Sequence, residues 1–507
     1  MSTPALTLSI SLVSHTNVGK TTLARTLLGR DVGEVRDAAH VTEAAEPHQL
    51  LESASGDRLL LWDTPGFGDS QRLARRLAQA GNPLGWLLSA VWDRWRDRPF
   101  WASQRAIRHV LDQADVALYL VNAAEPPEDS AWLAPELQVL GLLGKPVVVL
   151  LNQLGPPGTA ADETAELQRW QAHLATLQAQ PGCARVQAVL PLDAFARCWV
   201  QEGLLLQAVA AALPADRQPA MQRLADAWRS RQQATWQAAM GLLAQRLARA
   251  ALDREALPEA GWQAPVRRLA SGLGAALGWP ATGADPQAQA MAALAARLDA
   301  DIRANTEALI RLHGLDGQAT GAVLDSLARH FARREPVNEG KAALWGGAVA
   351  GALAGLKADI ASGGLTLGGG LLAGGVLGAL GAAGAARGVN RLRGIRQPLL
   401  AWDDAVLHQL LRSALLGYLA VAHHGRGRGD WQDNAAPAAW GDAVDAALAE
   451  RSAALQALWS ERAAWLLAAS APDAPAAWLA TLTALLADGS AAALRTLYPQ
   501  AARSAGL

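Results

Sequence analysis

One stretch near the N-terminus has the residue types and spacing of a phosphate-binding loop. Residues 14–22 read Ser-His-Thr-Asn-Val-Gly-Lys-Thr-Thr, the pattern G-x-x-x-x-G-K-[ST] with serine in place of the first glycine. In such a loop the backbone N–H groups bind phosphate oxygens, the lysine contacts the β- and γ-phosphates, and the next hydroxyl ligates Mg²⁺. The residues expected to contact the ligand are Ser14, Thr16, Asn17, Val18, Gly19, Lys20, Thr21 and Thr22.

A second group of such residues follows a short apolar run at 59–62. Asp63-Thr64-Pro65-Gly66 begins where this predicted strand ends. The Asp63 carboxylate can hold a Mg²⁺-bound water, and the N–H of Gly66 can contact a γ-phosphate, as in a switch loop. Pro-Gly is also a common turn pair, but the position one strand after the phosphate loop favours the switch. We therefore expect Thr21 and Asp63 at the metal, and Lys20 and Gly66 at the reacting phosphate.

The elements that must position these residues follow from hydrophobic periodicity. Residues 6–13 alternate as a β-strand does, and Leu23, Leu27 and Leu28 have helical spacing. Further apolar runs at 116–121, 147–151 and 186–192 are separated by helical patterns. This alternation predicts an α/β domain over residues 1–213, with a mostly parallel sheet and helices on both faces. A Trp-rich insertion at 70–110, expected to be a lid helix or a docking element, interrupts it after the switch.

The residues that would read the nucleotide base are only partly present. The predicted strand at 147–151 leads into Asn152-Gln153-Leu154-Gly155, where a guanine-reading motif has Asn-Lys-x-Asp. Gly155 replaces the acid that accepts two hydrogen bonds from guanine, each worth roughly 1.5–3 kcal/mol. We therefore expect guanine preference to be weaker by about tenfold or more. Asn152 stays a candidate nucleotide contact, and Asp193 either supplies part of the missing recognition or caps a helix.

The second half of the chain has helical patterns and one unusual segment. Residues 214–340 and 391–507 are predicted to be helical, with one long buried helix from Leu399 to Leu416 and an exposed basic loop at 423–429. Between them, residues 341–390 are rich in Gly and Ala, and residues 360–386 carry no charge over a length that can span a bilayer. Small residues at every fourth position predict a glycine-zipper hairpin. It either contacts a membrane or packs inside the protein.

Composition narrows the classes of partner and compartment. Lys and Arg number 45 against 46 Asp and Glu, so no overall field attracts nucleic acid. No basic and aromatic stripe indicates an RNA-binding module, and we expect no nucleic-acid partner. Cys183 and Cys198 lack metal-site spacing and indicate a reducing compartment. With no signal-peptide pattern, we expect a cytoplasmic protein at the cytoplasmic face of the inner membrane.

Residues 1–213 resemble the Era-like GTPases, the TrmE–Era–EngA–septin group. The whole chain resembles its bacterial branch with a long helical C-terminal domain of unknown function. The motifs that carry the resemblance are residues 14–22, Gly-Glu-Val-Arg-Asp at 33–37 and Asp-Thr-Pro-Gly at 63–66.

The resemblance implies a Mg²⁺-dependent GTP switch that hydrolyses GTP to GDP and phosphate. Phe67 stands where Ras-type proteins carry a catalytic glutamine, which implies slow hydrolysis. The resemblance also implies a switch-one threonine at the metal and the reacting phosphate. Thr42 is the candidate, although Ala38 or Ala39 could occupy that register.

Three functions are compatible with these features. The first is a slowly hydrolysing GTP switch, with GTP or GDP and Mg²⁺ as ligands, that passes its nucleotide state to a membrane-associated helical domain. The second is a structural or assembly protein whose glycine-zipper helices act at a membrane, with weak or relaxed nucleotide binding. The third is an ATPase or relaxed NTPase. In each, a protein partner or self-association is expected.

Overall fold

The computed structural model divides into two compact units. The first contains Met1–Ala234, His423–Trp431 and Leu497–Leu507, and the second contains Thr235–Ala422 and Gln432–Thr496. The structure describes residues 4–29, 46–68, 70–79, 85, 98–155, 160–194, 198–256, 286–315, 389–393, 398–424, 438–466 and 474–507. The boundary near residue 234 falls within one long helix, α8 (Gln218–Leu252).

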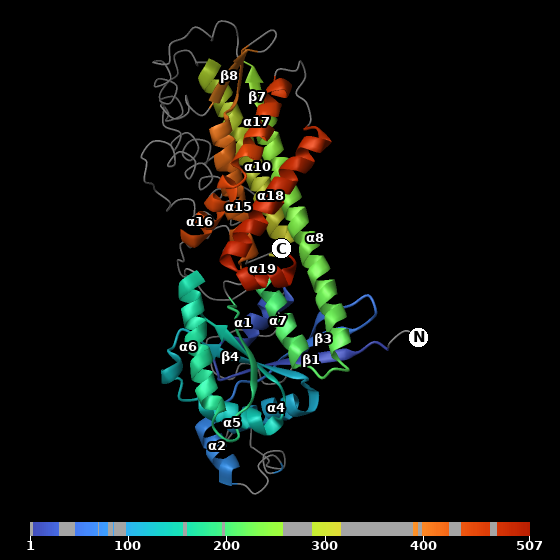
Figure 1. The fold of residues 1–507 in the computed structure, drawn as a ribbon, viewed down its shortest axis with the longest axis vertical. Coiled ribbons are helices and arrows are strands. Elements are labelled where there is room, and N and C mark those ends of the chain that lie inside the picture. Colours follow the sequence, from blue (N-terminus) through green and yellow to red (C-terminus); the bar gives the residue numbers. More distant parts are fainter. Residues whose placement is uncertain are drawn as a thin grey trace. The chain divides into compact units, whose positions relative to one another are not determined.

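A six-stranded sheet forms the centre of the first unit, in the order β2-β3-β1-β4-β5-β6 (Figure 1). Its strands are β1 (Thr7–Ser14), β2 (Glu46–Glu52), β3 (Arg58–Asp63), β4 (Val116–Asn122), β5 (Val147–Asn152) and β6 (Val186–Pro191). β2 is antiparallel to β3, and all other neighbours are parallel. Five strands lie where apolar runs predict them. β2 has no such run, because an edge strand needs no continuous apolar pattern.

Helices cover both faces of this sheet. They are α1 (Lys20–Leu28), α2 (Ser70–Gln79), α4 (Arg98–Gln113), α5 (Leu133–Leu143), α6 (Ala160–Gln178) and α7 (Trp199–Ala212). Ile107, Leu137 and Trp170, from α4, α5 and α6, join one buried cluster with strand residues, while α1 and α7 lie on the opposite face (Figure 1). The predicted α/β domain with a mostly parallel sheet is confirmed.

Residues near the C-terminus complete the first unit. Helix α19 (Pro499–Ala505) packs on α7, where a Cβ added to Gly203 would lie 3.3 Å from Ser504 Oγ. Tyr498, just before α19, has its hydroxyl 2.9 Å from Nε2 of His423, which is 1% exposed. The expected exposed loop at 423–429 is therefore wrong at its first residue, because this histidine has a buried hydrogen-bond partner.

An ion pair fixes the start of α8 to the turn between β2 and β3. Arg223 donates to both carboxylate oxygens of Asp57, over 2.7 and 2.9 Å. The Asp57 side chain is 0% exposed and also accepts hydrogen bonds from Ser53 Oγ and from the N–H of Leu6. The Arg223 guanidinium holds the pKa of Asp57 well below its usual range. The ion pair thus connects the β2–β3 turn, which lies between the two switch loops in the sequence, to helix α8.

Replacing Arg223 with methionine is expected to lower the free energy of unfolding at pH 7 by about 2–3 kcal/mol, because a buried carboxylate loses two charged hydrogen bonds. The folded pKa of Asp57 is depressed, so the contribution is complete above the unfolded pKa near 4 and is lost as pH falls through the folded pKa. Urea unfolding at pH 7 and pH 3 tests this. Arg229→Met, which breaks the exposed pair with Asp226 on the same helix, is the control and should cost less than about 0.5 kcal/mol. Equal losses in both variants would contradict the assignment.

The second unit is mainly helical and contains a small antiparallel sheet. Besides part of α8, its helices are α10 (Pro286–Leu312), α15 (Asp404–Ala422), α16 (Ala438–Ala449), α17 (Ser452–Leu466) and α18 (Ala476–Leu497). The sheet has the order β7-β9-β8, with β7 (Arg254–Ala256), β9 (Pro398–Trp402) and β8 (Val389–Arg393). Leu399 and Leu400 lie in β9, so the helix expected from Leu399 begins only at Asp404. Cross-strand pairing, which a helical spacing of leucines does not reveal, decides this.

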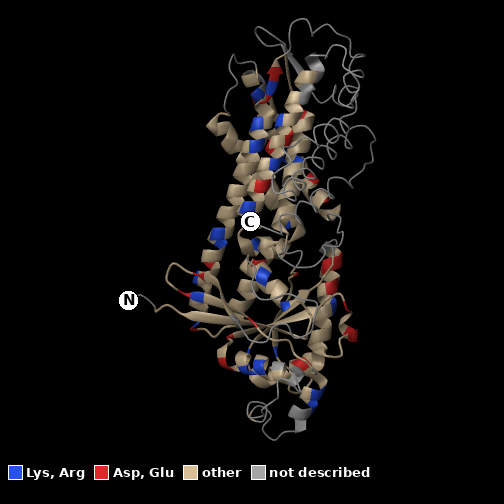
Figure 2. Cartoon of the chain, turned by 180° about the vertical axis from the view of Figure 1, so that it is seen from behind, with Lys and Arg blue, Asp and Glu red and all other residues tan. Residues whose placement is uncertain are grey.

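Two predicted features fall largely on residues outside the described ranges. The Gly/Ala-rich hairpin at 341–390 is one, and the middle of the 70–110 insertion is the other. Among described residues, α15 and α18 are long and apolar enough to cross a membrane, but 61% and 44% of their apolar windows are buried inside the protein. Buried core helices have the same composition. Basic and acidic residues are interspersed over the described parts of both units (Figure 2).

Candidate functional site

The phosphate loop connects the end of β1 to the start of α1 through two left-handed residues. Asn17 has φ 64° and Gly19 has φ 96°. Asparagine tolerates this conformation better than most residues. A Cβ on Gly19 would lie 2.8 Å from Nδ2 of Asn152, so glycine is needed here for close approach as well. The loop therefore curls around the N-terminus of α1, where anions bind.

Lys20 is buried inside this loop. Its ammonium donates to Ser14 Oγ over 2.9 Å, and the residue is 8% exposed. Burial lowers the pKa of Lys20, while the carboxylates of Asp63 and Glu136 raise it. The serine that replaces the first glycine thus has a role that the motif does not indicate: it holds the lysine in the loop. A buried ammonium between loop residues is suited to an anionic ligand.

The predicted metal ligands lie together. Thr21 Oγ1 donates to Asp63 Oδ2 over 2.5 Å. The strand register brings them together, because Leu12, near the end of β1, pairs with Asp63 at the end of β3. A hydroxyl and a carboxylate are the oxygen donors that Mg²⁺ prefers, so these residues fit that ion. Thr42 lies outside the described residues.

The switch-two segment, residues 63–68, is fixed to the phosphate loop. A Cβ on Gly66 would lie 3.0 Å from both Lys20 Nζ and Thr16 Cα, so the chain packs here only with glycine. The N–H of Phe67 donates to the Ser14 carbonyl over 2.8 Å, and its side chain is 1% exposed in the core. Phe67 is therefore a packing residue.

On the base side, Asn152 joins three loops. Its Nδ2 donates to the Val18 carbonyl over 2.7 Å, and its Oδ1 accepts from the N–H of Ala194 over 2.8 Å. Asp193 Oδ2 accepts from the N–H of Leu154 over 2.8 Å. Helix α7 has Cys198 as its N-cap, so the alternative that Asp193 caps a helix is wrong. Asp193 instead holds the loop that follows β5.

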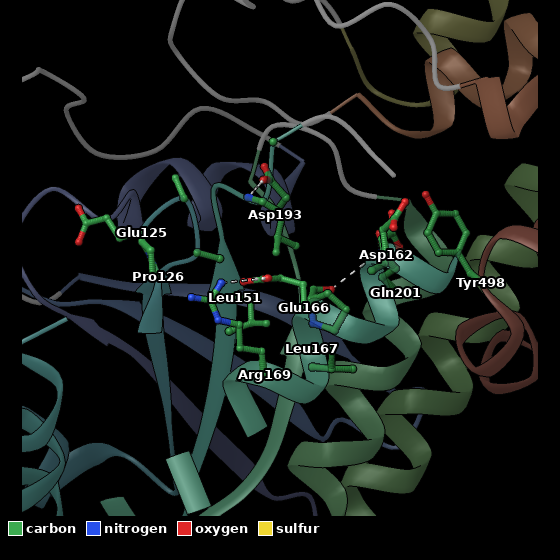
Figure 3. Close-up of a pocket in the computed structure, with 16 residues that line it drawn as sticks. Glu125, Pro126, Leu151, Asp162, Glu166, Leu167, Arg169, Asp193, Gln201 and Tyr498 are labelled. Atoms are coloured by element: carbon green, nitrogen blue, oxygen red, sulfur yellow. Dashed lines mark hydrogen bonds and ion pairs between the residues drawn. The ribbon is translucent and has the colours of Figure 1, made fainter. Parts of the chain in front are cut away.

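A pocket of about 410 Å³ adjoins these loops (Figure 3). Leu154, Gly155 and Asp193 line it, together with Tyr498 and acidic residues of α6. Gly155 has φ 78°, and nothing lies within 4 Å of the position its Cβ would take. The place of the missing base-reading acid is therefore open.

Two families match the chain. The model of the domain of unknown function DUF3482 matches residues 181–482, more than half of the chain. The chain belongs to the DUF3482 family. The model described as 50S ribosome-binding GTPase matches residues 9–153, which hold the phosphate loop and the switch-two segment. The chain therefore combines an Era-like, GTP-binding P-loop GTPase domain with a C-terminal domain of unknown function.

Solved structures with similarity to the chain include several GTPases. Era in complex with MgGDPNP and 16S ribosomal RNA is 20% identical over 41% of this chain and 58% of that chain, with a TM-score of 0.30. Era from Aquifex aeolicus bound to GDP and AlF₄⁻ is 19% identical over 41% and 57%, with a TM-score of 0.28. NFeoB from S. thermophilus, bound to mGMPPNP, is 16% identical over 46% and 70%, with a TM-score of 0.23. The chain spans less than two thirds of both Era chains. No curated protein matches it.

One buried polar residue of this region was not singled out from the sequence. Glu136 lies in α5, is 0% exposed and contacts the phosphate loop through His15, with His15 Nδ1 2.7 Å from its Oε1. The signal was present, because a single acid interrupts the apolar helix LAPELQVLGLL. Charged residues are rarely buried without a specific partner.

Proposed function

We propose that the protein is a Mg²⁺-dependent GTP switch with slow intrinsic hydrolysis. The observation that carries this proposal is the convergence of Lys20, the Thr21–Asp63 pair and Gly66 at one edge of the sheet. A buried ammonium, two hard oxygen ligands and a glycine against the loop are the groups that nucleoside triphosphate binding requires.

In this proposal each residue has a distinct task. Lys20 binds the β- and γ-phosphates, and the N–H of Gly66 contacts the γ-phosphate. Thr21 and Asp63 hold Mg²⁺, with Thr42 as the proposed third group. Bound Mg²⁺ neutralises phosphate charge. Phe67 is buried, so its position supplies no side chain that orients the attacking water, which supports a slow rate.

The purified protein tests this directly. Fluorescent GTP should bind in the presence of Mg²⁺, EDTA should weaken binding, and phosphate release should be slow. Unlabelled ATP should compete less well than GTP. A protein that neither binds nor hydrolyses GTP would refute the proposal, and equal competition by ATP would favour a relaxed NTPase.

Replacing Gly155 with aspartate should raise the preference for GTP over ATP by about tenfold or more, because the new carboxylate accepts charged hydrogen bonds from guanine. Aspartate tolerates the left-handed backbone, and the space at the Cβ is open. Competition binding measures the ratio. Gly144→Asp is the matched control, with φ 62° and equally open space at the C-cap of α5. An unchanged ratio in Gly155→Asp would mean that base recognition uses other groups.

The coupling to a membrane is a further part of the proposal. It is supported by the charge-free run at 360–386 and the arginines that flank it. Flotation with anionic phospholipid vesicles, with and without a GTP analogue, tests it. Deletion of residues 341–388, which leaves β8 intact, should abolish flotation; a deleted protein that still floats would contradict this role. The proposed location is the cytoplasmic face of the membrane, and the domain bounds at 213, 340 and 390 stay predictions.

A further inference from the structure

Glu136 is a fully buried carboxylate where the phosphate loop, the start of α2 and the sheet meet. Its Oε1 accepts a hydrogen bond from Ser70 Oγ over 2.5 Å and lies 2.7 Å from His15 Nδ1. Its Oε2 accepts from the Tyr119 hydroxyl over 2.7 Å. A carboxylate only accepts hydrogen bonds, so Nδ1 of His15 carries the proton. One side chain of α5 thus joins three other elements.

The position of Glu136 within α5 argues against a purely structural role. Leu133 and Leu140, three residues before and four residues after it on the same face, are at most 1% exposed and form part of the core. An apolar side chain would suit this position without the need for three partners, because burying a carboxylate is unfavourable. His15 also stacks on Trp132, with ring centroids 5.4 Å apart. The Glu136 carboxylate is therefore the centre of a buried hydrogen-bond network next to the phosphate loop.

Two hydrogen bonds bracket the chain from Phe67 to Ser70, at the end of the switch-two segment. Before the bracketed stretch, Phe67 N–H is bonded to Ser14, the neighbour of His15 in the phosphate loop. After it, Ser70 begins α2 and is bonded to Glu136, while Gly68 N–H donates to Ser103 Oγ of α4 over 3.0 Å. Gly66, proposed at the γ-phosphate, lies just ahead of this short tethered segment. Ser70 lies four residues after Gly66, so the start of α2 and the proposed γ-phosphate contact belong to one short stretch of the sequence.

We propose that Glu136 is a positioning residue for GTP hydrolysis: its carboxylate couples the phosphate loop, through His15, to the start of α2, through Ser70, and so holds Gly66 at the reacting phosphate. This rests on the GTPase function proposed above.

The test compares three variants that touch the same carboxylate. Ser70→Ala removes the link to α2, Glu136→Gln removes the charge, and Tyr119→Phe removes the hydrogen bond from the sheet and leaves the other two in place. The measurements are the single-turnover rate of hydrolysis of bound GTP, the Kd for fluorescent GDP and the Tm. Because Glu136→Gln could fold poorly, Ser70→Ala carries the test independently.

We expect Ser70→Ala and Glu136→Gln to lower the hydrolysis rate about tenfold or more while the Kd for GDP changes less than about threefold. Tyr119→Phe should keep the rate within about twofold. A Ser70→Ala protein with the wild-type rate, or rates that fall in all three variants in step with Tm, would overturn the inference. A wild-type protein that binds GTP without hydrolysing it would instead refute the proposed activity, and this role with it.

Discussion

Replacing Lys20 with alanine is expected to weaken the binding of GTP and GDP by about 100-fold or more. The lysine is the buried cation of the phosphate loop, and each charged hydrogen bond that it makes to phosphate is worth roughly 1.5–3 kcal/mol. Titration with fluorescent nucleotides measures the loss. The backbone N–H groups of the loop cannot replace the lost ammonium, because they carry only partial charges.

The control for this substitution is Lys145→Ala. Lys145 lies two residues before β5, at the opposite edge of the sheet from the phosphate loop. Its removal should leave affinity within about twofold, since charges in water are screened beyond about 10 Å. Full affinity in Lys20→Ala would contradict the role given to this lysine, and full cellular function in this variant would favour the assembly-protein alternative.

The second large effect is expected from Asn152→Ala. This asparagine is 0% exposed and satisfies the Val18 carbonyl and the Ala194 N–H. Truncation leaves both groups buried without that partner, and each such group costs about 1–3 kcal/mol. The free energy of unfolding should therefore fall by about 2–4 kcal/mol, and nucleotide affinity should fall as well because two ligand loops lose their common anchor.

Asn122→Ala provides the matched comparison. Asn122 pairs in register with Asn152 on the neighbouring strand, but its side chain bonds Glu125 and the N–H of Ala124 near the surface. Its loss should cost less than about 1 kcal/mol. Urea unfolding of both variants and a fluorescent-GDP titration give the two numbers. Similar values for the two asparagines would show that Asn152 is not the anchor.

The sequence pattern predicted those elements whose structure depends on residues that are close together in the chain. The buried strands have continuous apolar runs, and the phosphate loop has its glycine and lysine at fixed spacing, so both could be found from the sequence. β2 and β7 could not: β2 is an edge strand that pairs only with β3 and has no apolar run, and β7 pairs with β9 from a distant part of the chain. Leu399 and Leu400 have helical spacing relative to later leucines, yet pairing places them in β9.

The residues of the candidate site also divide into those that the sequence could predict and those that it could not. Lys20, Thr21 and Asp63 were predicted to meet because parallel strands end at one edge of a sheet. The task of Ser14 and the network around Glu136 depend on side chains from distant parts of the chain that meet only after folding. For Asp193 the sequence left a cap or a base contact open; Asp193 does not cap α7, it binds the N–H of Leu154, and the base contact stays a prediction.

The division of the first unit between distant parts of the chain has a consequence for biosynthesis. Because Leu497–Leu507 packs with Met1–Ala234, the second unit is an insertion within the first. A ribosome has to synthesise the whole insertion before α19 can cover α7 and Tyr498 can reach His423. Although its N-terminal part is synthesised first, the first unit is therefore completed only after the second unit has been synthesised. A nascent chain that lacks α19 exposes the apolar surface of α7, and chaperones and proteases recognise such exposed surfaces.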